Sequence, residues 1–426
     1  MKNRLPIITL FLANAISGCA QGISMIAIPW YFAKQNNMQF FALSFLVANI
    51  LSLFWAPNAG VIIDRYNRKN IFLAVNLICG LAIFSIAMIG YNTHSLASSW
   101  ISLVFIFTFL NYNIHYPNLY AFLQEVSSTE NYARVNAQIE IVEQITSMLS
   151  GALCALLLDG ISWEGQWSIL GNHFIIPLEV KAWNIWDIFL LDASTYFVSL
   201  GLILTIPYVH KLENKTDESS WIERINTGWV FMRDNFSIAM VAIAGSTLFV
   251  VTLVVLFYLE APYIKNFLQK GATVYANAEM AYSLGAFISG WICIRIFGAI
   301  TIPKGIFWMI FVFAICLLGL SVTKSVAVVL MVWLLLGLTN SGTRILRGTF
   351  MYKMVPNNIF GRVTSFFFLV NILLRIFFIA LFSLPFFWKN DNIIYCFVIL
   401  SAFLIFASFL MVKYTFHFNI YPEKEE

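Results

Sequence analysis

Charged residues are scarce in this sequence of 426 residues. Lys and Arg together number 25 and Asp and Glu 21, so that 11% of the chain is charged, against about 25% in ordinary soluble proteins. Because charged side chains normally cover a soluble surface, this scarcity excludes a soluble enzyme, a nucleic-acid-binding protein and a disordered scaffold. The formal net charge of +4 is small and indicates no particular partner.

Clusters of cysteine and histidine are also missing. The six cysteines lie far apart inside apolar runs, without a C-x-x-C pair. A zinc site or a disulfide framework needs close spacing, so we expect buried apolar cysteines, no metal site and no cofactor. The five histidines do not form the convergent set that an intramembrane protease or acyltransferase needs, and no phosphate-binding loop for ATP occurs. We therefore predict that the protein is not an enzyme and is not driven by ATP.

Apolar residues, in contrast, make up 60% of the chain, with a mean hydropathy of +0.80. A membrane-crossing helix needs about 20 mostly apolar residues, and the sequence contains twelve such runs. They lie at 6–33, 41–63, 70–91, 99–123, 133–158, 183–208, 238–262, 276–298, 302–321, 325–350, 361–387 and 391–413. The runs are continuously apolar, whereas the strands of a membrane barrel alternate. We predict an all-α integral membrane protein with twelve transmembrane helices.

The distribution of Lys and Arg predicts the orientation of these helices. With a cytoplasmic N-terminus, eighteen of the 25 basic residues fall on the cytoplasmic side and six on the other, and Arg375 remains within the membrane. This bias follows the positive-inside rule. An even number of spans then places both termini in the cytoplasm.

A hydrophilic stretch near the middle divides the twelve spans into six and six. It predicts an N-terminal six-helix bundle over 1–208, a cytoplasmic linker over 209–237 and a C-terminal six-helix bundle over 238–426. Within the linker, Ser220 and Glu223 have the spacing of a capping box at the start of a short helix. A second loop, 159–182, falls on the outer side and is rich in Trp; it is interpreted either as a set of interfacial anchors or as a lid over a substrate.

The turn between the second and third spans carries a recognisable motif. It reads Gly60-Val61-Ile62-Ile63-Asp64-Arg65-Tyr66-Asn67-Arg68-Lys69 and resembles the G-x-x-x-D-R-x-G-R-K signature of the major facilitator superfamily. Gly60 would allow a close helix approach, and Asp64 suits the positive end of a neighbouring helix dipole. Asn67 stands where the family has Gly, and Asn tolerates a left-handed turn better than most residues. The resemblance implies two six-helix bundles, and it implies a gating role for Gly60, Asp64, Arg65 and Arg68.

Three further stretches resemble the macrolide-efflux and enterobactin-exporter branch of that family. They are Tyr116–Ala137, with its Pro117, Glu125 and Asn136, then Phe189–Phe197 around Asp192, and Val355–Val363. The branch usually has G-P-x-x-G-G in its fifth span, where this chain reads Ser150-Gly151-Ala152-Leu153-Cys154-Ala155. The fourth and fifth spans also resemble the bacterial lysophospholipid flippase. Export, lipid flipping and import therefore all stay open as interpretations.

Polar residues recur at helical spacing within several apolar spans. Because polar groups are costly in lipid, each such stripe is expected to face a cavity or another helix. As substrate-binding candidates the stripes supply Gln21, Asn111, His115, Asn340, Arg344, Asn371 and Arg375. The Asn residues are equally compatible with hydrogen bonds between helices, and His115 is compatible with packing, proton transfer or ligand contact.

Acidic residues within the spans suggest how transport could be energised. Glu140 and Glu143 lie one helical turn apart in the fifth span, and two such carboxylates should not both ionise in a low dielectric. This pair indicates proton coupling, and a salt bridge to Arg344 or Arg347 is the alternative. Asp192 is expected to make a structural hydrogen bond.

Two charged residues further along the chain complete the predictions. Glu260 lies near the end of a span, where we expect it to be solvated. Arg375 lies near the middle of the membrane, where facing lipid would be costly. It is interpreted as a contact to an anionic substrate or as the partner of an acid.

These features together predict a secondary transporter of the bacterial inner membrane that works by alternating access. We expect a monomer whose partners are protons, the lipid bilayer and a small amphipathic, anionic or zwitterionic substrate. A proton-coupled exporter of the drug or siderophore type is the leading hypothesis. The alternatives are a lysophospholipid flippase or a metabolite importer, whereas a membrane sensor or enzyme fits the sequence poorly.

Overall fold

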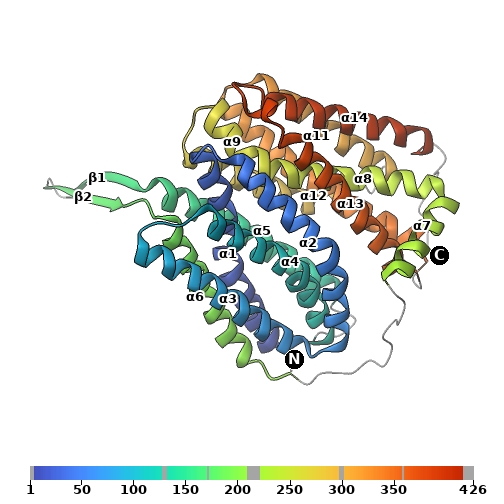
Figure 1. Cartoon of the computed structure of the whole chain (residues 1–426), viewed down its shortest axis with the longest axis horizontal. Helices are drawn as coiled ribbons and strands as arrows, with labels where there is room; N and C mark the ends of the chain where they lie inside the picture. Colours follow the sequence, from blue (N-terminus) through green and yellow to red (C-terminus); the bar gives the residue numbers. More distant parts are fainter. Residues whose placement is uncertain are drawn as a thin grey trace. The chain divides into compact units, whose positions relative to one another are not determined.

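The structure is a computed structural model, and it describes residues 4–126, 132–169, 172–208, 221–296, 302–356 and 359–415. Helices account for almost all of this part (Figure 1). The first half contains α1 (Arg4–Lys34), α2 (Met38–Arg65), α3 (Arg68–Thr93), α4 (Ser98–Val126), α5 (Tyr132–Asp159) and α6 (Ile185–Leu204). The second half contains α7 (Trp221–Asp234), α8 (Phe236–Val254), α10 (Ala272–Ile296), α11 (Ile302–Val322), α12 (Val326–Met354), α13 (Phe360–Phe382) and α14 (Ile394–Thr415).

Every predicted span coincides with a helix. Helix α8 continues through two π-helical turns, η2 (Val255–Leu259) and η3 (Tyr263–Phe267), on either side of the three-residue α9 (Glu260–Pro262). Within the described residues, ten helical stretches are long and apolar enough to cross a membrane. Helices α4 and α10 carry the other two predicted spans. The count of twelve crossings and the cytoplasmic position of both termini therefore stay predictions.

The chain forms two compact units. Unit 1 contains residues 1–44, 66–210 and 264–280, and unit 2 contains residues 45–65, 211–263 and 281–426. Helix α2 contributes its first residues to unit 1 and the remainder to unit 2, and α10 is divided in the same way. The predicted boundaries at 208 and 238 concern the sequence halves and stay a prediction.

The Trp-rich loop between α5 and α6 forms a β-hairpin that projects from the helices of unit 1 (Figure 1). Strands β1 (Ile161–Ile169) and β2 (Asn172–Val180) pair antiparallel, with Ile161 opposite Val180. The sequence was interpreted here only as an outer loop of interfacial anchors or a substrate lid, and no strands were predicted. Its alternation of Trp, Ile and Phe with polar residues is a pattern typical of strands, and this signal could have been used.

The linker contains the short helix that its capping pattern predicted. Helix α7 begins at Trp221, whereas Ser220 lies outside the described residues. A Cβ built on Gly228 would lie 2.7 Å from the carbonyl oxygen of Arg362 and 2.8 Å from Cβ of Phe366. Only glycine therefore allows α7 to pack this closely on α13 within unit 2.

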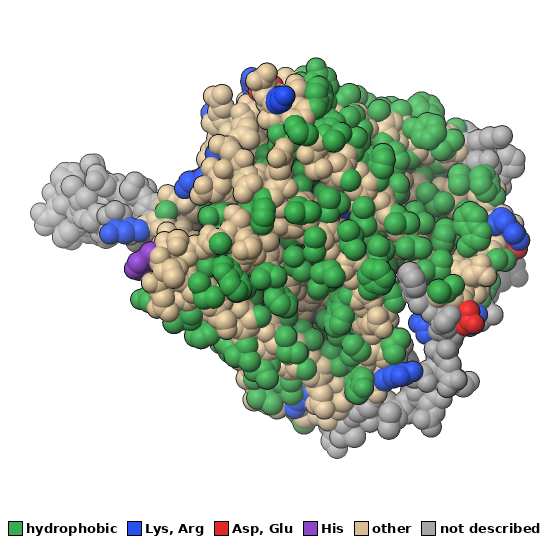
Figure 2. Space-filling model, viewed as in Figure 1, with side chains coloured by type: hydrophobic (Ala, Val, Ile, Leu, Met, Phe, Trp, Pro, Cys, Tyr) green, Lys and Arg blue, Asp and Glu red, His purple; other side chains and the backbone are tan. Residues whose placement is uncertain are grey.

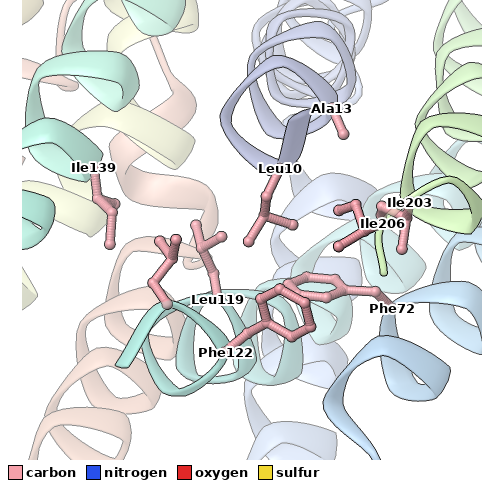
Figure 3. Packing of buried hydrophobic residues seen from close by; sticks show 9 residues of the cluster. Leu10, Ala13, Phe72, Leu119, Phe122, Ile139, Ile203 and Ile206 are labelled. Carbon is pink, nitrogen blue, oxygen red and sulfur yellow. The ribbon is translucent and has the colours of Figure 1, made fainter. Parts of the chain in front are cut away.

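A cluster of apolar side chains holds α1, α3, α4 and α6 together in unit 1 (Figure 3). Leu10, Phe72, Phe122 and Ile203 converge from these four helices, and each is at most 2% exposed. In a membrane, lipid is as apolar as these side chains, so close van der Waals packing replaces the hydrophobic effect as the stabilising contribution.

Small residues bring two pairs of helices into backbone contact. A Cβ on Gly22 of α1 would lie 2.4 Å from Oγ of Ser150 on α5. In unit 2, a Cβ on Gly285 would lie 1.9 Å from the carbonyl oxygen of Leu334, and one on Gly337 would lie 1.9 Å from that of Tyr282. Helices α10 and α12 therefore touch through two reciprocal glycines, as small residues allow in membrane proteins.

Large apolar side chains are exposed on many helices. Examples are Phe54 at 65%, Met331 at 66% and Phe406 at 62% exposure. In Figure 2, hydrophobic side chains are spread over the visible helices, and few charged side chains appear among them. Such a surface is suited to contact with lipid.

Candidate functional site

Polar side chains of α1 and α4 meet in the core of unit 1. His115 Nε2 lies 2.7 Å from Asn14 Oδ1, and the two residues are 7% and 8% exposed. The rings of Phe72 and Tyr116 approach the imidazole edge-on, with centroid distances of 5.2 and 5.4 Å. These contacts are the ones that the packing interpretation of His115 expects. A role in ligand binding or proton transfer stays a prediction.

Two other predicted residues of unit 1 keep unused hydrogen-bonding atoms. Asn111 Nδ2 donates to the Tyr196 hydroxyl at 3.2 Å, whereas Asn111 Oδ1 is buried without a hydrogen bond to any described residue. The same holds, within the described ranges, for Nε2 of Gln21, a residue that is 2% exposed. Because buried polar atoms are normally satisfied, these two atoms are suited to a polar ligand.

The predicted acidic pair of α5 is described only in part. The side chain of Glu140 lies outside the described residues. Glu143 is half-buried and interacts electrostatically with Tyr112 of α4, which also interacts with Asp192 of α6. Two acidic side chains of unit 1 therefore share one phenol as a neighbour. Proton coupling through Glu140 or Glu143 stays a prediction.

The signature turn between α2 and α3 differs from expectation at two positions. A Cβ built on Gly60 meets no atom within 4 Å, so the close helix approach predicted there is absent from the described part of the chain. Asn67 is not left-handed: it has φ −57° and ψ 118°, and its Oδ1 accepts a hydrogen bond from the Asn70 amide at 3.2 Å. Asn is among the best N-cap residues, so Asn67 fits this position because it starts α3.

Basic residues of the turn are anchored within unit 1. Arg68 Nε lies 2.8 Å from Glu125 Oε1, and the Tyr208 hydroxyl donates to the second carboxylate oxygen of Glu125. Burial, together with the carboxylate beside it, raises the pKa of Tyr208 above its ordinary value. Lys69 Nζ donates to the carbonyl oxygen of Leu204, the last residue of α6, at 2.9 Å and to that of Ile206, just beyond it, at 2.8 Å. The turn is thereby fixed to α4 and α6.

The gating residues themselves are tested less directly. Arg65 is exposed, and the side chain of Asp64 lies outside the described residues. Glu125, the partner of Arg68, belongs to the family-like stretch Tyr116–Ala137, and its pairing with Arg68 was not predicted from the sequence. The gating role of the motif stays a prediction.

Helix α12 presents a row of predicted residues in unit 2. Asn340 Nδ2 donates to the Tyr282 hydroxyl of α10 at 2.6 Å. One and two turns further on, Arg344 and Arg347 interact as like charges. Arg347 Nη1 donates to Ser246 Oγ of α8 at 2.9 Å. Two guanidinium groups are thus held near one another along one stretch of helix.

Arg375 of α13 is buried rather than exposed to lipid. It is 7% exposed, and its Nε donates to Oδ1 of Asn49, which is fully buried in α2. Asn49 Nδ2 donates to the carbonyl oxygen of Phe45 at 2.7 Å, so the amide is oriented with its oxygen toward the guanidinium. Asn49 could not be predicted as the partner of Arg375, because nothing in its local sequence pattern separates it from other intramembrane Asn residues. Asn371 Oδ1 is buried without a hydrogen bond to a described residue.

Two acidic residues within the spans are fully buried. Glu260 is 0% exposed, at the junction of the two π-helical turns, so the expectation that it is solvated is wrong. Asp192 is also 0% exposed, and neither carboxylate oxygen forms a hydrogen bond of normal geometry with the part of the chain that is described. Each interrupts an apolar run, and a lone acid in such a run is the signal that could have identified both.

The segment 264–280 is attached to α1 and α5 within unit 1. Asp159 Oδ2 at the end of α5 accepts hydrogen bonds from Thr273 N at 2.6 Å and from Thr273 Oγ1 at 2.7 Å. Lys265 Nζ donates to the last carbonyl oxygens of α1, including that of Ala33 at 3.1 Å. The rings of Trp30 and Tyr275 stack at a centroid distance of 5.5 Å. Asp159 thereby caps the start of α10 from another helix.

The described residues contain no group of three His, Cys, Asp or Glu side chains that could hold a metal ion. Five cysteines are free thiols, of which Cys79, Cys154, Cys316 and Cys396 are buried and Cys19 is partly exposed.

Comparison with solved structures finds the same fold in several transporters. A mutant of the nucleoside transporter NupG superposes with a TM-score of 0.74 at 12% identity, covering 96% of this chain and 99% of that chain. The D-xylose-proton symporter gives 0.70 at 12%, covering 96% and 98%. A bacterial homologue of the iron transporter ferroportin gives 0.68 at 16%, also covering 96% and 98%.

Family comparison covers most of the sequence. No curated protein matches the chain significantly. The family model described as Major Facilitator Superfamily matches residues 10–379. The match includes the signature turn and all the polar stripes, and it agrees with the apolar helices of a multi-pass membrane protein. The chain belongs to the major facilitator superfamily of membrane transporters.

Proposed function

We propose that this transporter moves a small amphipathic molecule with anionic or zwitterionic character by alternating access, and that it exports this molecule in exchange for protons. In this proposal the chain is a monomer of the bacterial inner membrane, with twelve spans and both termini in the cytoplasm. The substrate contacts are Gln21, Asn111 and His115 in unit 1, and Asn340, Arg344, Asn371 and Arg375 in unit 2.

The pair Arg344 and Arg347 carries the proposal of an anionic substrate. Both belong to one membrane-spanning helix and interact as like charges. Two guanidinium groups near one another favour an anion beside them, and the planar fork of Arg matches carboxylate, phosphate and catecholate oxygens. The recorded hydrogen bond of Arg347 is to the neutral Ser246 hydroxyl, which holds the side chain in place without cancelling its charge.

Packing around Arg347 supports the same interpretation. The methylene stem of Arg347 lies along α8, because a Cβ built on Gly245 would be at an ordinary contact distance of 3.4 Å from both its Cγ and its Cδ. Ser246 then positions the guanidinium at the end of that stem. A side chain held at both its stem and its head is preorganised for binding.

The proposal of proton exchange rests on Glu143 and its neighbours. Glu143 is half-buried in α5 and shares the neighbour Tyr112 with Asp192. Glu140 lies one helical turn before Glu143 in the sequence, and two carboxylates so spaced in low dielectric should not both ionise, so that one of them can carry a proton. Import remains the alternative direction, since the D-xylose-proton symporter has the same fold.

A thermal-shift screen of the purified protein tests the substrate class. The probes are a catecholate siderophore, a macrolide and an anionic lysophospholipid, which also separates the flippase alternative. We expect an anionic probe to raise the unfolding temperature. In Arg344→Gln and in Arg347→Gln its affinity should fall about 10- to 100-fold, because a hydrogen bond to a charged group contributes about 1.5–3 kcal/mol.

Lys353→Gln is the matched control, since Lys353 is an exposed basic residue on the same helix. Its affinity for the probe should equal that of the wild type. Unchanged affinity in both arginine variants would refute the anionic site.

A further inference from the structure

A fully buried carboxyl group lies in unit 1, outside the set of predicted substrate contacts. Asp192 of α6 is 0% exposed. The hydroxyl of Ser24 on α1 lies beside its carboxyl group. Cys79 of α3, Tyr112 of α4 and Tyr196 of α6 itself are the titratable side chains that interact with it. Side chains from four helices therefore surround this one acid.

Close packing separates Asp192 from water. A Cβ built on Gly80 of α3 would lie 3.1 Å from Cβ of Tyr196 and 3.3 Å from the ring of Phe197. Helices α3 and α6 are thus in close contact one turn after Asp192. Helix α1 packs along α6 as well. With Asp192 0% exposed, its carboxyl group has no contact with bulk water.

The neighbours of Asp192 do not supply a compensating positive charge. They are a hydroxyl, a thiol and two phenols, and the ion pairs recorded among the described residues do not include Asp192. An isolated carboxylate taken from water into such surroundings is very unfavourable, and the group takes up a proton instead. The neutral carboxyl group, which can donate one hydrogen bond, is the form that these surroundings hold.

We propose that Asp192 is a proton-binding site of this transporter and that it holds a proton in the conformation described here. When α1, α3 and α6 separate enough to admit water, the O–H bond of the carboxyl group breaks and water accepts the proton. A carboxylate remains until a proton from the other side of the membrane restores the neutral acid and allows the helices to close. The link to substrate movement rests on the proposed function, whereas the bound proton does not.

Tyr112 gives this site a connection to α5. Its phenol interacts with both Asp192 and Glu143. Tyr112 thus links the surroundings of Asp192 on α6 to those of Glu143 on α5 within unit 1.

Infrared spectroscopy of the purified full-length protein in lipid nanodiscs tests the bound proton at neutral pH. A protonated carboxyl group has a carbonyl stretching band that a carboxylate lacks. We expect this band in the difference spectrum of wild type minus Asp192→Asn. The control is Asp187→Asn, which removes a carboxyl group from the first turn of the same helix, where it accepts hydrogen bonds from Asn184. Its difference spectrum should lack the band.

Asn has the shape of a neutral Asp, so the Asp192→Asn variant should fold as well as the wild type. Failure of this variant to fold, or absence of the band from its difference spectrum, would overturn the proposal. Either result would mean that Asp192 is ionised and stabilises the fold as a carboxylate.

Proteoliposomes test the link to transport, with the catecholate siderophore as the probe. Asp192→Asn should keep exchange of the probe between the two sides at equal pH, and should lose acceleration by a pH gradient. A gradient response equal to that of the wild type would overturn the coupling role. If the wild type itself shows no gradient response, the proposed function fails, while the infrared band still reports whether Asp192 binds a proton.

Discussion

Replacing either glycine at the contact between α10 and α12 should destabilise the transporter. A Cβ on Gly285 would lie 1.9 Å from the Leu334 carbonyl oxygen, and one on Gly337 would lie 1.9 Å from that of Tyr282. Both distances fall 1.5 Å short of the 3.4 Å at which ordinary contact begins. The colliding atoms belong to the backbone, so they cannot rotate away, and the helices must separate.

The expected cost can be estimated from overpacked cores. Extra carbon atoms in a well-packed site cost about 1–3 kcal/mol, and we expect Gly285→Ala and Gly337→Ala at the upper end of that range. The separation would also weaken the 2.6 Å hydrogen bond between Asn340 and Tyr282, because Asn340 lies one turn from Gly337. Substrate affinity should therefore fall together with stability.

The assay is reversible unfolding of the purified protein in a mild detergent titrated with sodium dodecyl sulfate. Gly290→Ala on α10 and Gly348→Ala on α12 are matched controls, since a Cβ at either position meets no atom within 4 Å. Their free energies of unfolding should equal that of the wild type or exceed it by up to about 1 kcal/mol, because alanine favours a helix more than glycine does. Wild-type stability in both Gly285→Ala and Gly337→Ala would refute the close contact.

Four further predictions, each tested by substitution, concern the remaining parts of the account. Arg375→Ala should lower the free energy of unfolding by about 1.5–3 kcal/mol through loss of the Asn49 contact. It should also weaken binding of the anionic probe more than Arg375→Lys does. Unchanged affinity in folded Arg375→Ala would remove this residue from the substrate site. Asp159→Ala should lower the free energy of unfolding by about 1 kcal/mol, because the cap of α10 is lost. The double variant Asp159→Ala with Thr273→Ala should lose no more than the single variant, since the two residues act together. Additive losses would contradict this. Asp64→Asn should leave expression intact and abolish transport, and a wild-type transport rate would exclude the predicted gating role. At least one of the single variants Glu140→Gln and Glu143→Gln should lose gradient-driven transport. Full transport in both would assign these acids a structural role.

Helix positions could be predicted from the sequence because lipid imposes a simple rule on it. Every backbone group must be satisfied within the span, so a long apolar run has few alternatives to a helix. Each predicted span coincides with a helix for this reason. The family could be inferred from the motif at residues 60–69, whose charged residues lie in the turn between two apolar runs. The hairpin 161–180 lies outside the apolar runs, where the rule does not apply, and its strand pattern was not recognised.

Side-chain partners were much harder to predict. The sequence showed that Arg375 could not face lipid, but the choice of Asn49 as its partner depends on how α2 and α13 pack in unit 2. Asn67 was expected to relax a turn, whereas it caps a helix, because the same residue type serves both purposes. Glu260 was placed near solvent from its position along the run, and the packing around the π-helical turns buries it. Spacing along one helix gives the face of a residue and does not give what lies opposite.

The most direct test of the central claim is proton movement coupled to an anionic substrate. The wild-type protein is reconstituted into proteoliposomes that contain a pH-sensitive dye, and the catecholate siderophore or the anionic lysophospholipid that binds in the thermal-shift screen is added. The account predicts that the probe moves and that the dye reports a proton flux in the opposite direction. It also predicts that Arg347→Gln reduces both signals together while Lys353→Gln changes neither. Movement of the bound probe without any proton flux would contradict the claim.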